Sequence, residues 1–483
     1  MILRIARRIK RLLRPSPPLQ IETTSWPVDS LPVDADWTLV KPWPNFKDIP
    51  SPQENDRLEI FLFLQICYLG GVWEATKDLV HQLVKVNQER GRLRLTLGIH
   101  QDQTDTESLE SLGDDLSIVR IRMNPITRDS IVAMLGHRPK WLNEPVPGFC
   151  FFSGGAEAAI RADAWFGLLD RFPLPLMPLR PYGVLIYDML QKYVPQNFGP
   201  PDCGFFRWCR EGMKPTARAA RFVTVMTPQV QRDVLEEYQL EEHRVRLLPY
   251  GFDAHRRFGA VHPEAVPVPR VPFILFVANA AIHKGAGTLL KAFGKLRQSG
   301  LQNLPPLVLC GTDTDRFSRN FKGDADHPNG PIIRKLVLEL GLEEGIDVVF
   351  LGFVTEAQLR HLYETCSAVV LASKHDMGTL CLVEATYFGK PIICSRYPSN
   401  EFICNRYSIE ARFFAIDDSE ALAELLREFI LAPPKSLSAE DLASVRHRLA
   451  NPELCTPRYA YDCLVELAEE GRREKMTTLS RVA

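Results

Sequence analysis

Ala368-Val-Val-Leu-Ala-Ser-Lys-His-Asp-Met-Gly-Thr-Leu-Cys-Leu-Val-Glu-Ala385 is the stretch of this 483-residue sequence that decides the fold. It opens with an apolar run of strand length, 368–372, crosses a polar turn, and continues as a helix over 380–388. A strand without polar alternation is typical of a parallel sheet that helices cover on both faces. In open sheets of this kind, ligands bind outside the carboxyl ends of the strands. The turn is therefore the first candidate for a site.

The same alternation of strands and helices extends outward from this stretch. The second half contains further predicted strands at 273–278, 306–310, 347–351 and 391–394. The first half contains predicted strands at 58–68, 93–99, 117–122, 183–188, 221–226 and 244–249. Residues 261–272 hold four prolines and no helical pattern, which indicates a linker. We therefore predict an α/β fold of two doubly wound Rossmann-like domains, 55–260 and 273–432, facing across a cleft, with C-terminal helices over 433–483 that pack back on the first half.

The composition excludes several classes of protein. Hydrophobic residues make up 45% and charged residues 24% of the chain, which is ordinary for a globular protein and unlike a disordered or coiled-coil chain. The 58 basic and 59 acidic residues leave no global field that would recruit nucleic acid. No apolar run reaches the ~18–20 residues of a membrane-spanning helix. The 11 cysteines are odd in number and form no C-x-x-C pair, so we expect reduced thiols in a cytoplasmic protein and no metal site.

The first 14 residues differ from the rest of the chain. They contain six basic and no acidic side chains, with Ile2, Ile5, Ile9, Leu12 and Leu13 near one helical face. A basic amphipathic helix suits an anionic membrane surface. A solvated tail and a targeting peptide are the alternatives. The proline-rich stretch 15–54 that follows is predicted to be an extended linker.

Two further turns are candidate anion sites. Gly70-Gly71 lies between a predicted strand and a predicted helix, so its amides and the helix N-terminus can face an anion, although a plain turn would have the same sequence. Lys284 comes just before another helix, beside His283, where a cation can neutralise a diphosphate. The alternative for Lys284 is a solvated loop lysine.

The turn of the opening stretch carries two carboxylates. Asp376 precedes the helix and Glu384 lies one turn into it, with the amides of Gly378 and Thr379 between them. Such a pair can bind sugar hydroxyls or the paired hydroxyls of a ribose. The alternative is a helix-terminal charge at Asp376 and a solvent-facing Glu384. Because Glu384 has apolar neighbours in sequence, we expect it to have a polar partner.

These motifs, in this order and spacing, resemble the retaining glycosyltransferases of the two-Rossmann GT-B architecture, group 1, also called family 4. The resemblance extends over 58–431. In the second half it rests on 276–285, 349–354 with 359–363, 372–395, and Pro398-Ser-Asn-Glu401. In the first half it rests on Gly70-Gly71, Val184–Asp188 with Val194-Pro195, and Arg232-Asp233 with Leu248–Asp253.

The resemblance implies roles for individual residues. Asp376 would contact the donor sugar near its anomeric carbon, Lys284 would bind the diphosphate, and Asp188 would face the transferred sugar; we predict these three as catalytic. Glu384 would bind the ribose of the nucleotide. The predicted donor-binding set is Gly70, Gly71, Asn279, His283, Lys284, Gly378, Thr379, Leu380 and Glu384.

Four residues depart from the family pattern. Asn279 stands where arginine is usual, Asp376 where glutamate is usual, Tyr187 where histidine is common, and Thr379 where glycine is usual. His283 or Arg396 are candidates to replace the missing cation.

The resemblance implies a retaining transfer of a sugar from a nucleotide-diphosphate donor to a hydroxyl of a glycan or glycolipid, without a cofactor or an obligate metal. We expect a role in cell-surface polysaccharide assembly in the cytoplasm, at the inner membrane face if residues 1–14 bind it. Two alternatives remain: a binding or scaffold protein that has lost turnover, and a sugar-nucleotide epimerase on the same fold.

Overall fold

The computed structural model describes residues 57–67, 71–143, 148–169, 171–172, 174–195, 212–249, 253–259, 262–266, 268, 272–322, 327–376, 379–451 and 456–482. The basic tail 1–14, the proline-rich stretch 15–54, Gly70 and Gly378 lie outside these residues, so their predictions stay untested.

The first domain is built on an eight-stranded sheet in the order β4-β3-β2-β1-β5-β6-β7-β8. All neighbouring strands are parallel except β3 and β4, which pair antiparallel. The strands are β1 (Leu58–Leu64), β2 (Leu93–His100), β3 (Ser117–Ile126), β4 (Phe149–Gly154), β5 (Ala164–Gly167), β6 (Tyr182–Ile186), β7 (Phe222–Val225) and β8 (Val245–Leu247).

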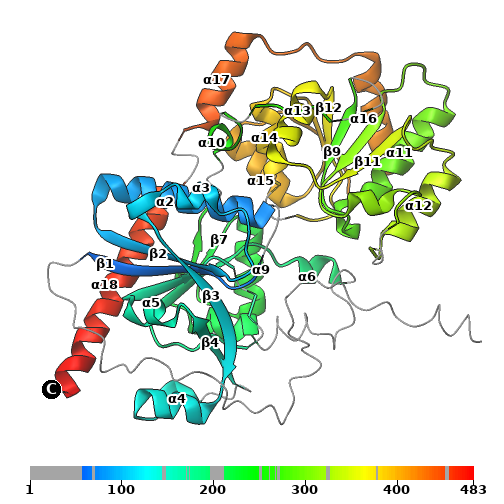
Figure 1. Cartoon of the computed structure of the whole chain (residues 1–483). Coiled ribbons are helices and arrows are strands. Elements are labelled where there is room, and N and C mark those ends of the chain that lie inside the picture. Colours follow the sequence, from blue (N-terminus) through cyan, green and yellow to red (C-terminus); the bar gives the residue numbers. More distant parts are fainter. Residues whose placement is uncertain are drawn as a thin grey trace, which may run out of the picture.

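Helices cover both faces of this sheet (Figure 1). They are α2 (Gly71–Arg90), α3 (Glu107–Glu110), α4 (Arg128–Leu135), α5 (Ala156–Arg161), α6 (Leu190–Tyr193), α8 (Lys214–Ala219) and α9 (Pro228–Tyr238). Thr227 begins α9 by accepting a hydrogen bond from the Val230 amide, with Pro228 at the first helical position. Alternate side chains of the central strand β1 enter one core or the other, which is why this strand is apolar apart from Glu59.

The second domain is a six-stranded, wholly parallel sheet in the order β11-β10-β9-β12-β13-β14. Its strands are β9 (Ile274–Val277), β10 (Leu307–Cys310), β11 (Val348–Gly352), β12 (Ala368–Leu371), β13 (Ile392–Ser395) and β14 (Ala411–Phe414). Its helices are α11 (Ala286–Gln298), α12 (Gly330–Glu339), α13 (Glu356–Thr365), α14 (Leu380–Tyr387), α15 (Pro398–Tyr407), α16 (Ser419–Leu431) and α17 (Ala439–Leu449).

The two sheets confirm the predicted fold class. In each sheet the strand order reverses direction once: between β1 and β5 in the first domain, and between β9 and β12 in the second. Such reversals open the crevices in which doubly wound folds bind their ligands.

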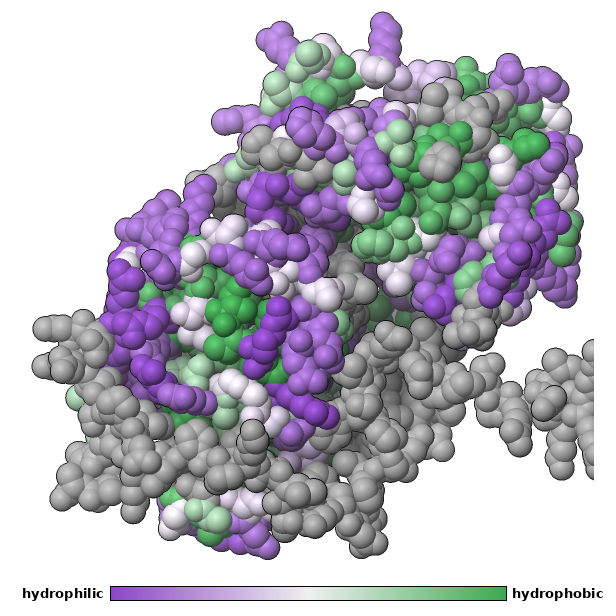
Figure 2. Space-filling view, in the orientation of Figure 1, coloured by the Kyte–Doolittle hydropathy of each residue, from purple (hydrophilic) through white to green (hydrophobic). Residues whose placement is uncertain are grey.

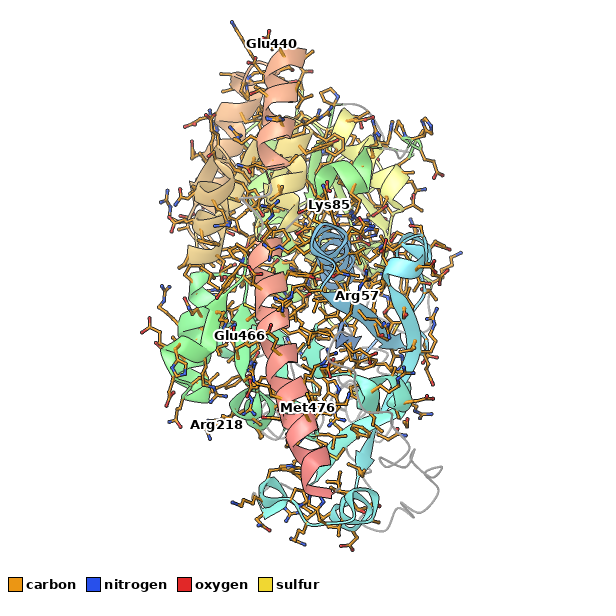
Figure 3. The ribbon with its side chains drawn as sticks, turned by 90° about the vertical axis from the view of Figure 1, so that its left-hand side faces the viewer. Arg57, Lys85, Arg218, Glu440, Glu466 and Met476 are labelled. Carbon is orange, nitrogen blue, oxygen red and sulfur yellow. The ribbon has the colours of Figure 1, made fainter. Side chains whose placement is uncertain are left out.

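The last helix, α18 (Pro457–Val482), returns to the first domain after the second domain is complete. It lies along α2, β1 and β5 (Figure 3). Tyr461 is fully buried in the first domain's core and its hydroxyl donates to Asn87 Oδ1 at 2.8 Å. The predicted packing of the C-terminal helices on the first half is therefore confirmed for α18. Helix α17 instead contacts α14 of the second domain.

Helix α10 (Ala254–Phe258) contacts α13 and α14 of the second domain. Phe258 is fully buried in the second domain's core, and Val266 and Val268 pack against the same core. The predicted linker 261–272 is thus in part packed against the second domain, through these two valines.

Strand β11 forms one edge of the second sheet, and large apolar side chains are exposed near it. Figure 2 shows apolar surface on this domain. The exposed side chains around this edge are Ile332 and Leu338 of α12, with Ile346 and Phe353 beside β11.

Candidate active site

The crevice of the second domain brings two predicted residues together. Strands β9 and β12 are neighbours, so the turns after their carboxyl ends meet. One turn contains a short 3-10 helix, Ile282–Lys284, and the other contains Asp376. Gly285 allows this approach: its φ is +77°, and a Cβ there would lie 1.9 Å from the Ala372 carbonyl oxygen.

Lys284 and Asp376 form an ion pair between Nζ and Oδ2. Both side chains are about one-fifth exposed, 18% and 19%. Burial alone would lower the pKa of Lys284, but the Asp376 carboxylate outweighs it and raises that pKa. Lys284 is therefore a cation at any physiological pH.

Asp188 approaches this pair from the first domain. It follows β6, and its Oδ1 accepts hydrogen bonds from Arg171 Nη2 at 3.0 Å and from the Leu190 amide at 3.2 Å. Its negative charge is near enough to contribute to the raised pKa of Lys284. The three residues predicted as catalytic therefore gather between the domains.

Two other residues of the predicted donor-binding set, His283 and Asn279, add no positive charge beside Lys284. His283 is buried, and burial lowers the pKa of its imidazole to about 3, so the ring is neutral at pH 7. Asn279 is exposed, and its Oδ1 accepts a hydrogen bond from the Ala281 amide at 3.2 Å. Arg396, the other candidate to replace the usual arginine, pairs with Glu401 at 3.0 Å on the surface.

Glu384 has the polar partners that its apolar surroundings required. The residue is only 2% exposed. Tyr363 Oη donates to its Oε2 at 2.5 Å, and Arg257 Nη1 donates to its Oε1. The predicted partner of Glu384 is thus confirmed, and the solvent-facing alternative is wrong.

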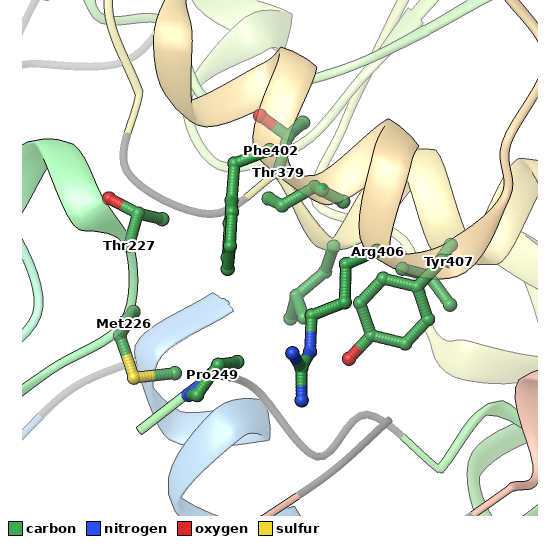
Figure 4. Close-up of a pocket in the computed structure, with 10 residues that line it drawn as sticks. Met226, Thr227, Pro249, Thr379, Phe402, Arg406 and Tyr407 are labelled. Carbon is green, nitrogen blue, oxygen red and sulfur yellow. The ribbon is translucent and has the colours of Figure 1, made fainter. Parts of the chain in front are cut away.

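Hydrogen bonds of Thr379 also fix the start of α14. Thr379 donates a hydrogen bond to Asn400 Oδ1 at 3.1 Å, and its hydroxyl lies 3.3 Å from Tyr397 Oη. Leu380 and Thr379 also line a narrow interdomain pocket of about 10 Å³, together with Met226, Thr227, Pro249, Val383, Phe402, Ile403, Arg406 and Tyr407 (Figure 4). A space of that size holds about one water molecule.

The first domain contacts the Asp376 loop directly through α6. The ring of Tyr193 stacks on His375, with centroids 4.3 Å apart and planes at 27°. Its Oη donates to the Asp233 carboxylate at 2.7 Å. Gly71 begins α2 and faces open space, since a Cβ there would meet nothing within 4 Å.

The sequence did not single out Arg257, Tyr363, Tyr193 or Arg171. Tyr363 ends the stretch 359–363 and Tyr193 precedes Val194-Pro195, but no role was assigned to either, and only the tertiary fold brings these side chains to the site. The one available signal was the Arg256-Arg257 pair, which comes just after Leu248–Asp253, a segment on which the family resemblance rests.

No group of three or more metal-ligating side chains occurs within the described ranges. No helix of that part of the chain is both long and apolar enough to span a bilayer.

Part of this chain matches a known protein family. Residues 262–443 match the family described as glycosyl transferases group 1. Mannosylfructose-phosphate synthase from Agrobacterium fabrum (strain C58) is 26% identical over 183 residues, which cover 36% of this chain. The match spans only 38% of that relative's length.

Solved structures share the two-domain GT-B fold. HepE from Anabaena, in complex with UDP and glucose, aligns with a TM-score of 0.50 at 14% identity over 88% of this chain and 100% of its own. A glycosyltransferase from Rickettsia africae ESF-5 aligns with a TM-score of 0.54 at 15% identity, over 85% and 99%. WaaG, a glycosyltransferase involved in lipopolysaccharide biosynthesis, gives 0.51 at 14%, over 84% and 99%.

Proposed function

We propose that this chain, which carries a group 1 glycosyltransferase domain on a GT-B fold, moves a sugar with retention of configuration from a nucleotide-diphosphate donor to a hydroxyl group. The observation that carries the proposal is the Lys284–Asp376 ion pair, facing Asp188 across the domain boundary. A cation and two carboxylates at such a place match the charges that develop when a glycosyl diphosphate breaks.

Lys284 supplies the positive charge. The diphosphate gains negative charge as the bond to the anomeric carbon lengthens, and a fixed ammonium group stabilises it in a partly dry site. The proposed role does not require any change in protonation, because the raised pKa keeps Lys284 charged. Lys284 then exchanges part of its contact with the Asp376 carboxylate for contact with the diphosphate.

The carboxylates act on the sugar. The anomeric carbon becomes positively charged in the transition state, and Asp376 and Asp188 lie on opposite sides of the domain boundary, where they can orient and stabilise it. Retention requires the acceptor hydroxyl to attack from the face that the diphosphate leaves. Closing the domains excludes water, which would otherwise hydrolyse the donor.

The acceptor that we propose is a glycan or a glycolipid of the cell surface, met in the cytoplasm at the inner membrane face. The basic tail 1–14 supports this, as does the involvement of the structural neighbour WaaG in lipopolysaccharide biosynthesis. HepE, in its complex with UDP and glucose, supports a nucleotide-sugar donor. We propose that the reaction needs no obligate metal or cofactor.

One observation favours a binding protein as the second candidate. Asn279 stands where the family usually has arginine, and its side chain accepts a hydrogen bond from the Ala281 amide of its own loop. His283 is neutral. Neither position therefore adds a second positive charge beside Lys284 for the diphosphate.

Thermal-shift measurements with UDP-, GDP-, ADP- and dTDP-sugars test the proposal. Occupancy at 100 times the dissociation constant stabilises a protein by about 2.7 kcal/mol, which is a readable shift. We expect a shift with one base, followed by a product whose anomeric configuration, read by NMR, matches that of the donor. Binding without turnover over a panel of hydroxyl acceptors would favour the binding protein, and an inverted product would contradict retention.

A further inference from the structure

The side chain of Arg257 is the meeting point of three carboxylates from three helices. Its Nη1 donates to Glu384 of α14, and its Nε donates to Glu356 of α13 at 3.0 Å. The same Nε lies 3.8 Å from Oε2 of Glu74, in α2 of the first domain. Arg257 is only 10% exposed, so little water screens these contacts.

The charges around Arg257 confirm that this arrangement favours its ionised form. Burial would lower the pKa of the guanidinium, but the surrounding carboxylates raise it above its ordinary value; they belong to Glu384, Glu74, Glu356 and Asp78. A buried cation with these partners holds a fixed orientation, because Glu384 accepts from Nη1 while Glu356 accepts from Nε of the planar guanidinium group.

The neighbouring residue strengthens the attachment of α10 to the first domain. Arg256 Nε donates to Asp78 Oδ1 at 2.7 Å, and the Asp78 side chain is fully buried. Adjacent residues of one short helix thus bind opposite domains: Arg256 binds the first, and Arg257 binds the second while also facing Glu74 of the first.

We propose that Arg257 is a positioning residue that fixes the Glu384 carboxylate for nucleotide binding and couples it to the placement of the first domain. The inference rests on the proposed function and on the role that the family resemblance implies for Glu384, which is to bind the ribose of the nucleotide. Arg257 would not touch the nucleotide itself. It holds Glu384 from one side while Tyr363 holds it from the other, and any movement of α2 relative to α14 changes the field at that carboxylate.

The test compares full-length variants Arg257→Gln and Arg257→Lys with the control Arg360→Gln. Arg360 contacts the same short helix, donating to the Phe258 carbonyl at 2.6 Å, but its carboxylate partner is Glu364 of its own helix. Calorimetry with UDP, GDP, ADP and dTDP, below the melting temperature of each variant, gives the dissociation constants. Small-angle X-ray scattering gives the radius of gyration.

We expect Arg257→Gln to weaken nucleotide binding at least tenfold, Arg257→Lys to recover part of the loss, and Arg360→Gln to stay within twofold of the wild type. A purely structural role would lower the melting temperature and leave the affinity unchanged, which would overturn the inference. If Arg257→Gln does not fold, the lysine variant carries the same comparison.

The scattering separates this inference from the proposed function. We expect a larger radius of gyration in Arg257→Gln than in the wild type and in Arg360→Gln. If the wild type binds none of the four nucleotides, the proposed donor is wrong, and Arg257 is judged by the radius alone. An unchanged radius would then overturn the coupling between the domains.

Discussion

Replacing Lys284 with methionine should remove the positive charge that the proposed mechanism places against the diphosphate, with little change in side-chain length. A charge-assisted hydrogen bond is worth about 1.5–3 kcal/mol, and 1.4 kcal/mol corresponds to a tenfold change in affinity. We therefore expect nucleoside diphosphate binding to weaken roughly 10- to 150-fold. The Asp376 carboxylate would lose its ion pair with Lys284, but at 19% exposure water can still reach it, so the protein should remain folded.

Lys374 offers a matched control for this substitution. It lies two residues before Asp376, and its Nζ donates to Asp417 Oδ2 at 2.5 Å, so it is also a paired lysine at this turn. Lys284→Met and Lys374→Met each remove one positive charge. Comparing their affinities for the same nucleotide by calorimetric titration therefore separates the effect of the position of the lysine from the effect of the lost charge. Equal affinities in the two variants would refute the placement of the diphosphate at Lys284. Because the pKa of Lys284 is raised, the wild-type affinity should also show no loss from lysine deprotonation up to pH 9.

Three further predictions concern stability and the membrane. Asp163→Ala should lower the free energy of unfolding, measured by chemical denaturation, by about 3–5 kcal/mol. The Asp163 side chain is only 1% exposed, and its carboxylate pairs with Arg472 and Lys475. As a control, Asp462→Ala removes an exposed ion pair and should cost about 0–1 kcal/mol. Burial raises the pKa of Asp78 to about 7, so its contribution to stability is present at low pH and is lost as the pH rises from about 4 through 7. In Asp78→Asn, the free energy of unfolding should therefore change less with pH over this range. The same pH dependence as in the wild type would contradict the raised pKa. Deleting residues 1–14 should abolish co-sedimentation with anionic vesicles without lowering the melting temperature, and persistent binding would exclude the tail as the anchor.

Sequence patterns predicted the fold and part of the site because those features are local. The strand-turn-helix units around Lys284 and Asp376 are readable from apolar runs, and the strand order of a doubly wound sheet brings their turns together. The apolar neighbours of Glu384 predicted that it has a partner, but they did not identify it. Arg257 lies 127 residues away along the chain. Its place beyond Leu248–Asp253 was the one sequence signal, and that signal does not show which carboxylate it binds.

The contacts that hold the two domains together were the least predictable. The Tyr193–His375 stack joins α6 to the Asp376 loop, and neither residue stands in a repeating pattern. Such contacts depend on how two completed domains meet, which no periodicity within either domain encodes. The neutral state of His283 was equally hidden, since it follows from burial rather than from sequence neighbours.

The return of α18 to the first domain sets an order of events during synthesis. The strands of the first domain leave the ribosome early, but the core they form stays incomplete until Tyr461 and the leucines that follow it have been made. The second domain, from β9 to α17, is continuous in sequence and can close before that. Domains usually complete themselves in the order in which they are translated. In this chain the domain that starts first is finished last. If translation stops between α17 and α18, the released protein has a complete second domain, but its first domain lacks the helix that completes its core.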